Sequence, residues 1–256
     1  MSFASQVKNS LLQDITDMAQ MPWLFSKHPE SDFSRNRKLN FQSLIHFCIC
    51  MEAGTIRHEL LKYFAYDSDT LSNSAFHQQR NKLLPDTFPF LLRQFNDHYP
   101  FSLYKGKYHL LACDGSSFTF TRNPNDQDSY FAPDGKTTNG YNQLHVVALY
   151  DLLSKRYCDT IVQPIRKKSE FQALADMIDR YHVTDATPIF IADRGFHSLN
   201  VFAHAIEHNS YFLIRAKDIN MQRLLGKDIP NDENFDIQIN RILTRTQSKK
   251  KHLQKT

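Results

Sequence analysis

The chain has 256 residues, of which 41% are hydrophobic and 23% charged, and its formal net charge at pH 7 is +4. This length and composition fit one large or two ordinary folded domains and exclude an intrinsically disordered chain. No apolar run is long enough to cross a membrane and the first residues lack a signal peptide, so we expect a cytoplasmic protein with no membrane partner.

Residues 1–100 have the pattern of a helical domain. Apolar side chains recur at helical spacing at Val7, Leu11 and Ile15, and Pro22 is expected to follow the end of that helix. The same spacing predicts further helices near residues 41–49, 55–64, 72–84 and 88–95. A folded, all-helical unit is therefore expected to open the chain.

This helical region carries a candidate DNA-binding element. Two short helices that flank the polar turn at residues 67–69 resemble a helix-turn-helix, in which the second helix reads the major groove. We expect contacts to DNA from Arg35, Arg37, Lys38, Gln78, Arg80 and Lys82. An amphipathic helix with an ordinary solvated face stays open as the alternative, because residues 1–100 carry equal numbers of basic and acidic side chains.

After residue 100 the pattern changes to alternating strands and helices. Strands are predicted at residues 108–113, 144–150, 157–163, 189–192 and 211–215. Ser169 and Ser198 are the expected caps of the two helices that separate the last three strands. The order βββαβαβ predicts an α/β fold in which a ribonuclease H-like mixed sheet with flanking helices fills residues 101–218.

Asp114 and Asp193 each follow an apolar run and precede a glycine-containing segment that is expected to turn at once. In the ribonuclease H-like order, the first and fourth strands are neighbours, so these two carboxylates are expected to lie side by side. Paired carboxylates suit Mg²⁺ or Mn²⁺, and two such ions can assist a phosphoryl displacement. Each Asp taken alone has a simpler interpretation as a turn residue.

The motifs Asp114-Gly-Ser and Asp193-Arg-Gly-Phe, together with the strands around them, resemble bacterial insertion-sequence transposases of the DDE class. The resemblance covers roughly residues 35–240. It implies that Asp114 and Asp193 are catalytic metal ligands, that the cofactor is Mg²⁺ or Mn²⁺, and that Arg194 contacts phosphate. It also implies double-stranded DNA partners, namely terminal inverted repeats and target, and a homodimer in a synaptic complex.

The chain departs from this family at the third acid. The family supplies a Glu within a Tyr-xx-Arg-xxx-Glu pattern, which the sequence does not contain. Residues 219–256 are expected to begin a β-rich insertion with a basic, disordered end. We therefore expect an incomplete transposase that cleaves DNA barely or not at all by itself.

Two other functions stay open. One is a non-enzymatic, DNA-binding remnant or regulator of transposition, which the missing Glu favours. The other is a ribonuclease H-like nuclease outside transposition, in which Asp151 or Asp159 would be the additional ligand. If the chain by itself did cleave element ends, the third ligand would have to be sought among Asp151, Asp159 and Glu170.

Overall fold

The computed structural model describes residues 2–135, 139–182, 185–216 and 236–238. The chain divides into two compact units, Met1–Pro100 and Phe101–Thr256. Across the described residues, no helix combines the length and the apolar character needed to span a bilayer. The expected insertion at residues 219–256 lies outside the described residues, apart from 236–238.

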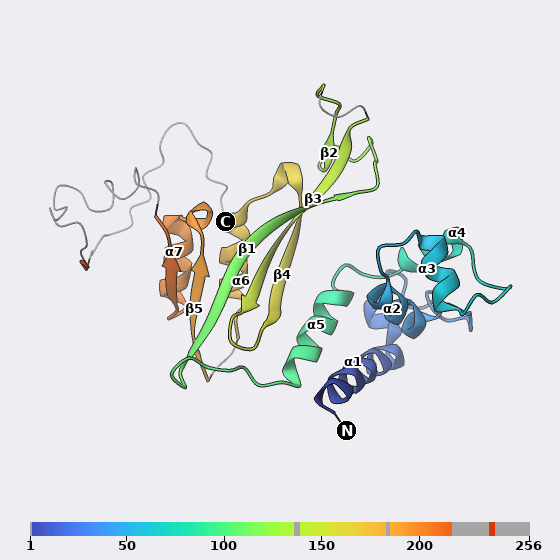
Figure 1. Ribbon diagram of the computed structural model, residues 1–256, viewed down its shortest axis with the longest axis horizontal. Helices are drawn as coiled ribbons and strands as arrows, with labels where there is room; N and C mark the ends of the chain where they lie inside the picture. The colour runs from blue at the N-terminus through green and yellow to red at the C-terminus, as the bar shows by residue number, and fades with distance from the viewer. Residues whose placement is uncertain (1, 136–138, 183–184, 217–235, 239–256) are drawn as a thin grey trace. The chain divides into compact units, whose positions relative to one another are not determined.

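The elements named in the described part of the first unit are all helices, joined by loops (Figure 1). Its elements are α1 (Phe3–Gln20), η1 (Pro22–Phe25), α2 (Phe41–Cys50), α3 (Ile56–Tyr63), α4 (Asn73–Arg80) and α5 (Thr87–Asp97). Polar residues cap the starts: the side chains of Asn40, Thr55 and Ser72 each accept a hydrogen bond from a backbone N–H in the first turn of the following helix. The predicted helical domain is thus present.

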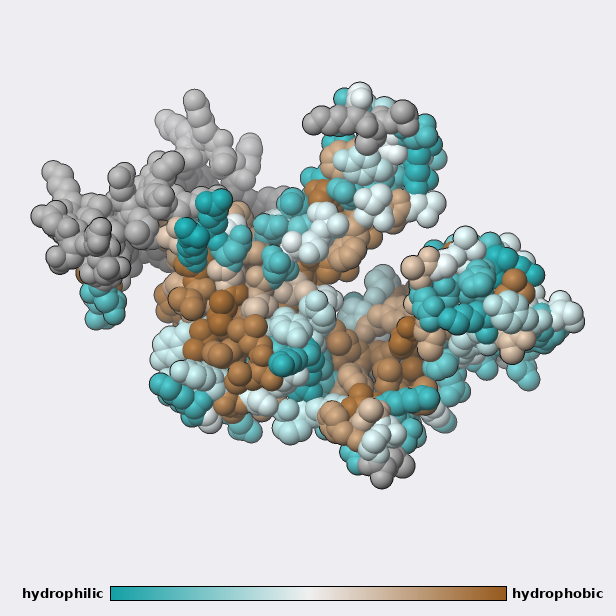
Figure 2. All heavy atoms as spheres, viewed as in Figure 1, coloured by the Kyte–Doolittle hydropathy of each residue, from teal (hydrophilic) through white to brown (hydrophobic). Residues whose placement is uncertain are grey.

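Aromatic rings form much of the interior of the helical unit. Phe47 on α2 packs edge-on against Phe76 of α4 with ring centroids 5.1 Å apart, and both side chains are buried. Ile15 and Met18 of α1 and Leu44 of α2 belong to the same cluster. Hydrophilic side chains predominate on the visible surface of α3 and α4 (Figure 2).

Two features of this unit differ from the prediction. Helix α4 ends at Arg80 rather than near residue 84, because Leu83 forms an isolated β-bridge with Ser26. The connection between α3 and α4 spans residues 64–72. That is longer than the three or four residues of a helix-turn-helix, so the predicted motif is not formed in its usual geometry.

The second unit contains a six-stranded mixed sheet with two longer helices. Its elements are β1 (Tyr108–Phe120), β2 (Tyr130–Phe131), β3 (Tyr141–Asp151), β4 (Arg156–Pro164), η2 (Ile165–Lys167), α6 (Glu170–Asp179), β5 (Thr187–Ala192), η3 (Arg194–Phe196), α7 (Leu199–Glu207) and β6 (Tyr211–Ile214). Strands pair in the order β4-β3-β1-β5-β6, with β2 also against β3. The β1 and β5 strands are parallel, whereas β1 and β3 are antiparallel. This is the ribonuclease H-like arrangement that the sequence predicted.

Helices α6 and α7 pack together on one face of the sheet (Figure 1). Side chains of β1 alternate between the faces, so that Leu111 and Cys113 are buried in the core beneath the helices while Asp114 is exposed. Ser169 caps α6 as predicted, through a hydrogen bond from Gln172 N. Ser198 precedes α7, but its side chain makes no capping hydrogen bond, so that prediction was wrong.

Strand β1 is longer than predicted. It continues past Asp114 to Phe120, because β3 pairs with it along the whole stretch from Leu111 to Phe120. Figure 1 shows β1 and β3 running on beyond β5 to reach β2. The turn expected directly after Asp114 is therefore absent, and β2 is an additional strand that the sequence pattern did not indicate.

Candidate functional site

Asp114 and Asp193 follow neighbouring positions on two parallel strands. In the pairing of β1 with β5, Cys113 lies opposite Ala192, and each Asp is the next residue. Because the two strands are parallel and paired in this register, Asp114 in the middle of β1 lies next to Asp193, which directly follows β5. The prediction that the first and fourth strands of the βββαβαβ order are adjacent is confirmed.

Both carboxylates are held by nearby backbone and kept open to solvent. Asp114 Oδ1 accepts a hydrogen bond from Gly115 N at 2.8 Å, and Asp193 Oδ1 accepts one from Gly195 N at 2.7 Å. Within the described part of the chain, neither acid has a Lys, Arg or His partner. Each Oδ2 thus keeps its lone pairs, and hard oxygen donors of this kind fit Mg²⁺ or Mn²⁺.

Gly115 leaves space for neighbouring side chains and does not form a turn. A Cβ built on Gly115 would lie 2.6 Å from Nε2 of His145 and 3.1 Å from Oε1 of Glu170. These two atoms are themselves 2.9 Å apart, although the ring N–H is not aligned on the carboxylate as in a good hydrogen bond. The His145 ring is fixed from its other side by Ser117, whose Oγ lies 3.0 Å from Nδ1. The Asp-Gly sequence therefore lets α6 begin directly against the strand that carries Asp114.

A third carboxylate, Glu170, lies near this edge of the sheet. Burial raises the pKa of the Cys113 thiol, and the charges of Asp114, Glu170 and Asp193 raise it further. All three acids are thus within electrostatic reach of one buried sulfur. Glu170 also approaches Lys168 Nζ, at 3.8 Å. Its contacts with His145 and Lys168 distinguish it from the two acids that have no cationic partner.

Asp114 lines a hollow of about 320 Å³ on the face of the sheet opposite α6 and α7. Tyr150 and Tyr157 form part of its wall, with ring centroids 5.2 Å apart and nearly perpendicular planes. Phe118 is 57% exposed beside it. This face of the sheet therefore places exposed aromatic side chains beside the carboxylate of Asp114.

The two acids considered as extra ligands for a nuclease are engaged elsewhere. Asp151 is fully buried, and its Oδ1 accepts hydrogen bonds from the backbone N–H groups of Leu153 and Ser154. Asp159 accepts two hydrogen bonds from Arg180, at 2.7 and 3.0 Å. Neither arrangement resembles that of Asp114 and Asp193, so the geometry does not favour the nuclease alternative.

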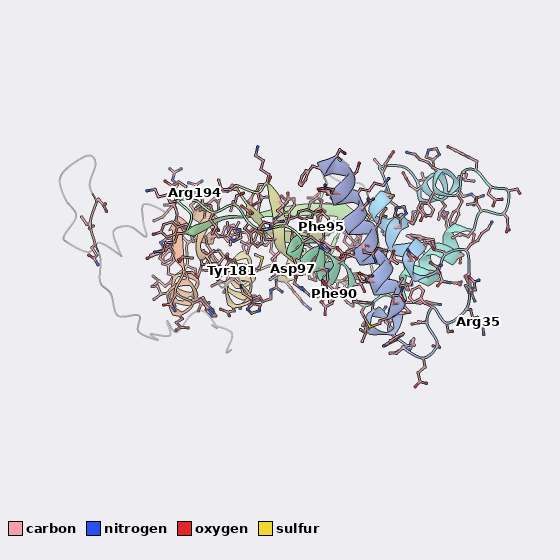
Figure 3. All side chains as sticks on the ribbon, turned by 90° about the horizontal axis from the view of Figure 1, so that it is seen from below. Arg35, Phe90, Phe95, Asp97, Tyr181 and Arg194 are labelled. Atoms are coloured by element: carbon pink, nitrogen blue, oxygen red, sulfur yellow. The ribbon has the colours of Figure 1, made fainter. Side chains whose placement is uncertain are left out.

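Asp151 belongs to a separate buried network near the start of β1. Its Oδ2 lies 3.3 Å from Nε2 of His109, and Nδ1 of His109 is 2.7 Å from the Tyr181 hydroxyl. Tyr181 follows α6 (Figure 3). His109, Asp151 and Cys158 also place one donor atom each within 4.8 Å of one another. This mixed, buried donor set differs in chemistry from the exposed carboxylates.

Three of the predicted DNA-binding residues share one pocket. Arg35, Arg37 and Lys82 line a hollow of about 290 Å³ in the helical unit. Arg35 extends from the loop that precedes α2 (Figure 3). Gln79 lines the same pocket but is not among the residues predicted to bind DNA. A buried amide on the inner side of a short polar helix leaves no signal in a single sequence.

The other predicted contacts lie outside that pocket. Lys38 Nζ is 2.9 Å from Asp67 and 3.1 Å from Asp69, and these acids raise the pKa of Lys38. Arg80 is exposed and lies over the Phe76 ring, with Cζ 5.5 Å from its centroid. The remaining two, Gln78 and Arg194, are also exposed. Arg194 directly follows Asp193 at the end of β5 (Figure 3).

Comparison with known proteins places this fold in a family. The family model described as "Transposase DDE domain" matches residues 105–255, which is more than half of the chain. The Drosophila P element transposase in a strand transfer complex aligns with 10% identity and a TM-score of 0.35, over 87% of this chain and 50% of the solved one. The chain thus spans half the length of that solved chain, and a likeness this distant carries no argument here. No match was found among curated proteins. The domain match and the ribonuclease H-like sheet show that the chain belongs to the transposase DDE domain family.

Proposed function

We propose that the chain is the transposase of an insertion sequence, acting in the cytoplasm. Its part in the reaction is to bind double-stranded DNA at the element's terminal inverted repeats and to supply two of the carboxylates that cleave this DNA and join the freed end to target DNA. The observation that carries this proposal is the register that places Cys113 opposite Ala192, because it delivers Asp114 and Asp193 to one edge of the sheet. The synaptic complex is a homodimer.

Asp114 and Asp193 would hold Mg²⁺ or Mn²⁺ through their free carboxylate oxygens. When bound, such ions make a water or a DNA 3′-hydroxyl a better nucleophile and stabilise the leaving oxygen. The chain's own contribution is to fix the two carboxylates. Each is oriented by a backbone N–H, from Gly115 or Gly195, while the exposed Arg194 would anchor a phosphate of the DNA.

The third carboxylate of the family pattern is not assigned to a residue. The sequence has no Tyr-xx-Arg-xxx-Glu pattern. We propose that the 256-residue chain by itself therefore cleaves DNA barely or not at all, since two carboxylates hold the ions poorly. The test of function is best done with the complete element, so that any partner segment is supplied.

The experiment is a transposition assay with the complete element on a donor plasmid. Asp114→Asn or Asp193→Asn is expected to lower transposition by on the order of 10³-fold or more, because a lost metal ligand removes several kcal/mol of transition-state stabilisation. Asp159→Asn is the matched control, since Asp159 is paired with Arg180, and should transpose within a few-fold of the parent. Normal transposition by the Asp193→Asn element would refute the proposal, and a loss confined to Asp159→Asn would contradict the roles given to Asp114 and Asp193.

A further inference from the structure

The polar pocket in the helical unit has the composition of an anion site. Arg35, Arg37 and Lys82 line it together with Asn40 and Gln79. One acid, Glu30, also lines it and is exposed at the surface. Three cations thus face one carboxylate, which leaves the pocket positive.

The cations of this pocket are largely uncommitted. In the described residues, Arg35 and Arg37 form no ion pair or hydrogen bond. Lys82 has only a long contact, with Nζ 3.8 Å from Oδ1 of Asp32, and it lies 5.3 Å from the Phe33 ring centroid. The Asp32 carboxylate is already used by the backbone, because its Oδ2 accepts the His28 N–H. Counting Asp32 as well as Glu30, the net charge around the pocket is 3 − 2 = +1.

Gln79 is the feature that separates this pocket from an ordinary solvated loop. Gln79 is only 5% exposed and lines the pocket, yet its side-chain amide makes no hydrogen bond within the described part of the chain. The amide atoms are not among the fully enclosed side-chain atoms, so they open onto the pocket, where a ligand oxygen can accept from the amide N–H groups.

We propose that this pocket binds one phosphate group of the DNA backbone. The inference rests on the proposed function and deepens it, since it divides the predicted DNA-binding residues into a phosphate-holding set and a set with other roles. Arg35 and Arg37 neutralise the phosphate, Lys82 adds a third cation, and Gln79 orients one oxygen by donating a hydrogen bond. Phosphate contacts of this kind fix the register of a protein on DNA without reading its sequence.

The test measures DNA binding by the full chain as a function of salt. The probe is double-stranded DNA from the flanks of the chain's own gene, followed by fluorescence anisotropy. Loss of a cation that neutralises phosphate lowers the dependence of log affinity on log salt by about one. Arg35→Ala and Arg37→Ala should each weaken binding and reduce this slope. The double variant should lose less than the sum of the two, because both side chains serve one phosphate.

Lys38→Ala is the matched control. Lys38 lies in the same segment as Arg37, but its charge is neutralised by Asp67 and Asp69. Lys38→Ala should therefore leave both the affinity for DNA and its salt slope within about 2-fold of the parent. Loss of an ordinary phosphate contact would instead lower both.

Gln79→Met separates a binding role from a structural one. Met has a similar shape but no donor, so affinity should fall by about 3-fold to 10-fold with the salt slope unchanged, as expected for a neutral hydrogen bond. An unchanged affinity in Gln79→Met, or Arg35→Ala and Arg37→Ala behaving like Lys38→Ala, would overturn the phosphate assignment. Arg35, Arg37 and Lys38 are all exposed, so the second of these results does not depend on a substitution in the protein interior.

Two further outcomes locate a failure. If the chain binds no DNA at any salt, both this inference and the proposed function fail. The second outcome combines two observations: every pocket variant binds DNA like the parent, and inorganic phosphate protects the parent, but not Arg35→Ala, from thermal unfolding. In that case the pocket holds a free anion and the DNA assignment is wrong.

Discussion

Asp114 and Asp151 lie on adjacent strands of one sheet and have opposite surroundings. Asp114 is exposed, accepts one backbone hydrogen bond and has no cationic partner in the described residues. Asp151 is 0% exposed, accepts two backbone hydrogen bonds and lies against His109. The fold thus satisfies the charge of Asp151 and leaves the charge of Asp114 available.

The difference teaches where a charge can be removed without unfolding the protein. A buried, hydrogen-bonded carboxylate leaves orphaned donors behind when it is lost. An exposed carboxylate beside another one leaves nothing unpaired. Four stability measurements, taken from the largest expected effect to the smallest, test whether this contrast holds.

Removal of the buried acid is expected to have the largest effect. Asp151→Ala should lower the free energy of unfolding by about 3–5 kcal/mol, because it strands the N–H groups of Leu153 and Ser154 and leaves His109 without its carboxylate. Urea denaturation measures this loss. Asp159→Ala, which breaks the partly exposed pair with Arg180, should cost no more than about 1 kcal/mol. If Asp151→Ala and Asp159→Ala lowered the free energy of unfolding equally, burial would not explain the difference between the two kinds of carboxylate.

Filling the space above Gly115 is expected to have an intermediate effect. In Gly115→Ala the new methyl group would meet His145 Nε2 at 2.6 Å, so the ring or the strand must shift. Overpacking of this kind costs about 1–3 kcal/mol. In a His145→Ala background most of the penalty should be lost, because the closest atom is gone and the next neighbour, Glu170 Oε1 at 3.1 Å, is the end of a flexible side chain. A penalty that persists in full would place its cause in β1 or Glu170 rather than in the ring.

The fold was more predictable than the detail of the site. Alternating apolar segments predicted the strand order, and the caps at Thr55, Ser72 and Ser169 marked helix starts by a local hydrogen bond. Strand length was less predictable. The stretch after Asp114 contains Gly115 and two serines, which suggest a turn, and only pairing with the distant β3 makes it a strand.

Residues around the site depend on contacts that one sequence does not display. Glu170 has the expected place of a first-turn acid in α6, and nothing nearby in the sequence relates it to His145. Lys38 looks like Arg37 in the sequence, yet Asp67 and Asp69 neutralise only Lys38. Asp114 and Asp193 could be nominated because strand ends are a local signal and parallel strands carry them to one edge.

A pH dependence is the next expected effect in size. Burial lowers the pKa of His109 below its ordinary 6.5, the charge of Arg156 lowers it further, and Asp151 offsets part of this. Tyr181 also contacts the ring, with its hydroxyl 2.7 Å from Nδ1. The unfolded chain then binds a proton below about pH 6.5 that the folded chain does not, so stability is complete above this pH and falls as the pH is lowered.

His109→Gln isolates this contribution from the other histidines. The loss of unfolding free energy between about pH 7.5 and pH 5.5 should be smaller in the variant, by at most about 1.4 kcal/mol in total, because only about one pH unit of this window lies below the ordinary pKa. Parallel pH profiles for the parent and His109→Gln would show that the ring is protonated in the folded protein.

The smallest effect on stability is expected where the effect on function is largest. Asp114→Asn keeps an acceptor for the Gly115 N–H, and Asp193→Asn does the same for Gly195 N. Neither change leaves a cation unpaired among the described residues, and each removes one of two negative charges that lie at the same edge of the sheet. The free energy of unfolding should therefore change by less than about 0.5 kcal/mol, with a slight gain favoured because like charges repel. Urea denaturation in metal-free buffer measures this, since bound metal would stabilise the parent alone. A loss of 2 kcal/mol or so in either variant would assign these acids to the scaffold, and the separation between the exposed and the buried carboxylate would no longer hold.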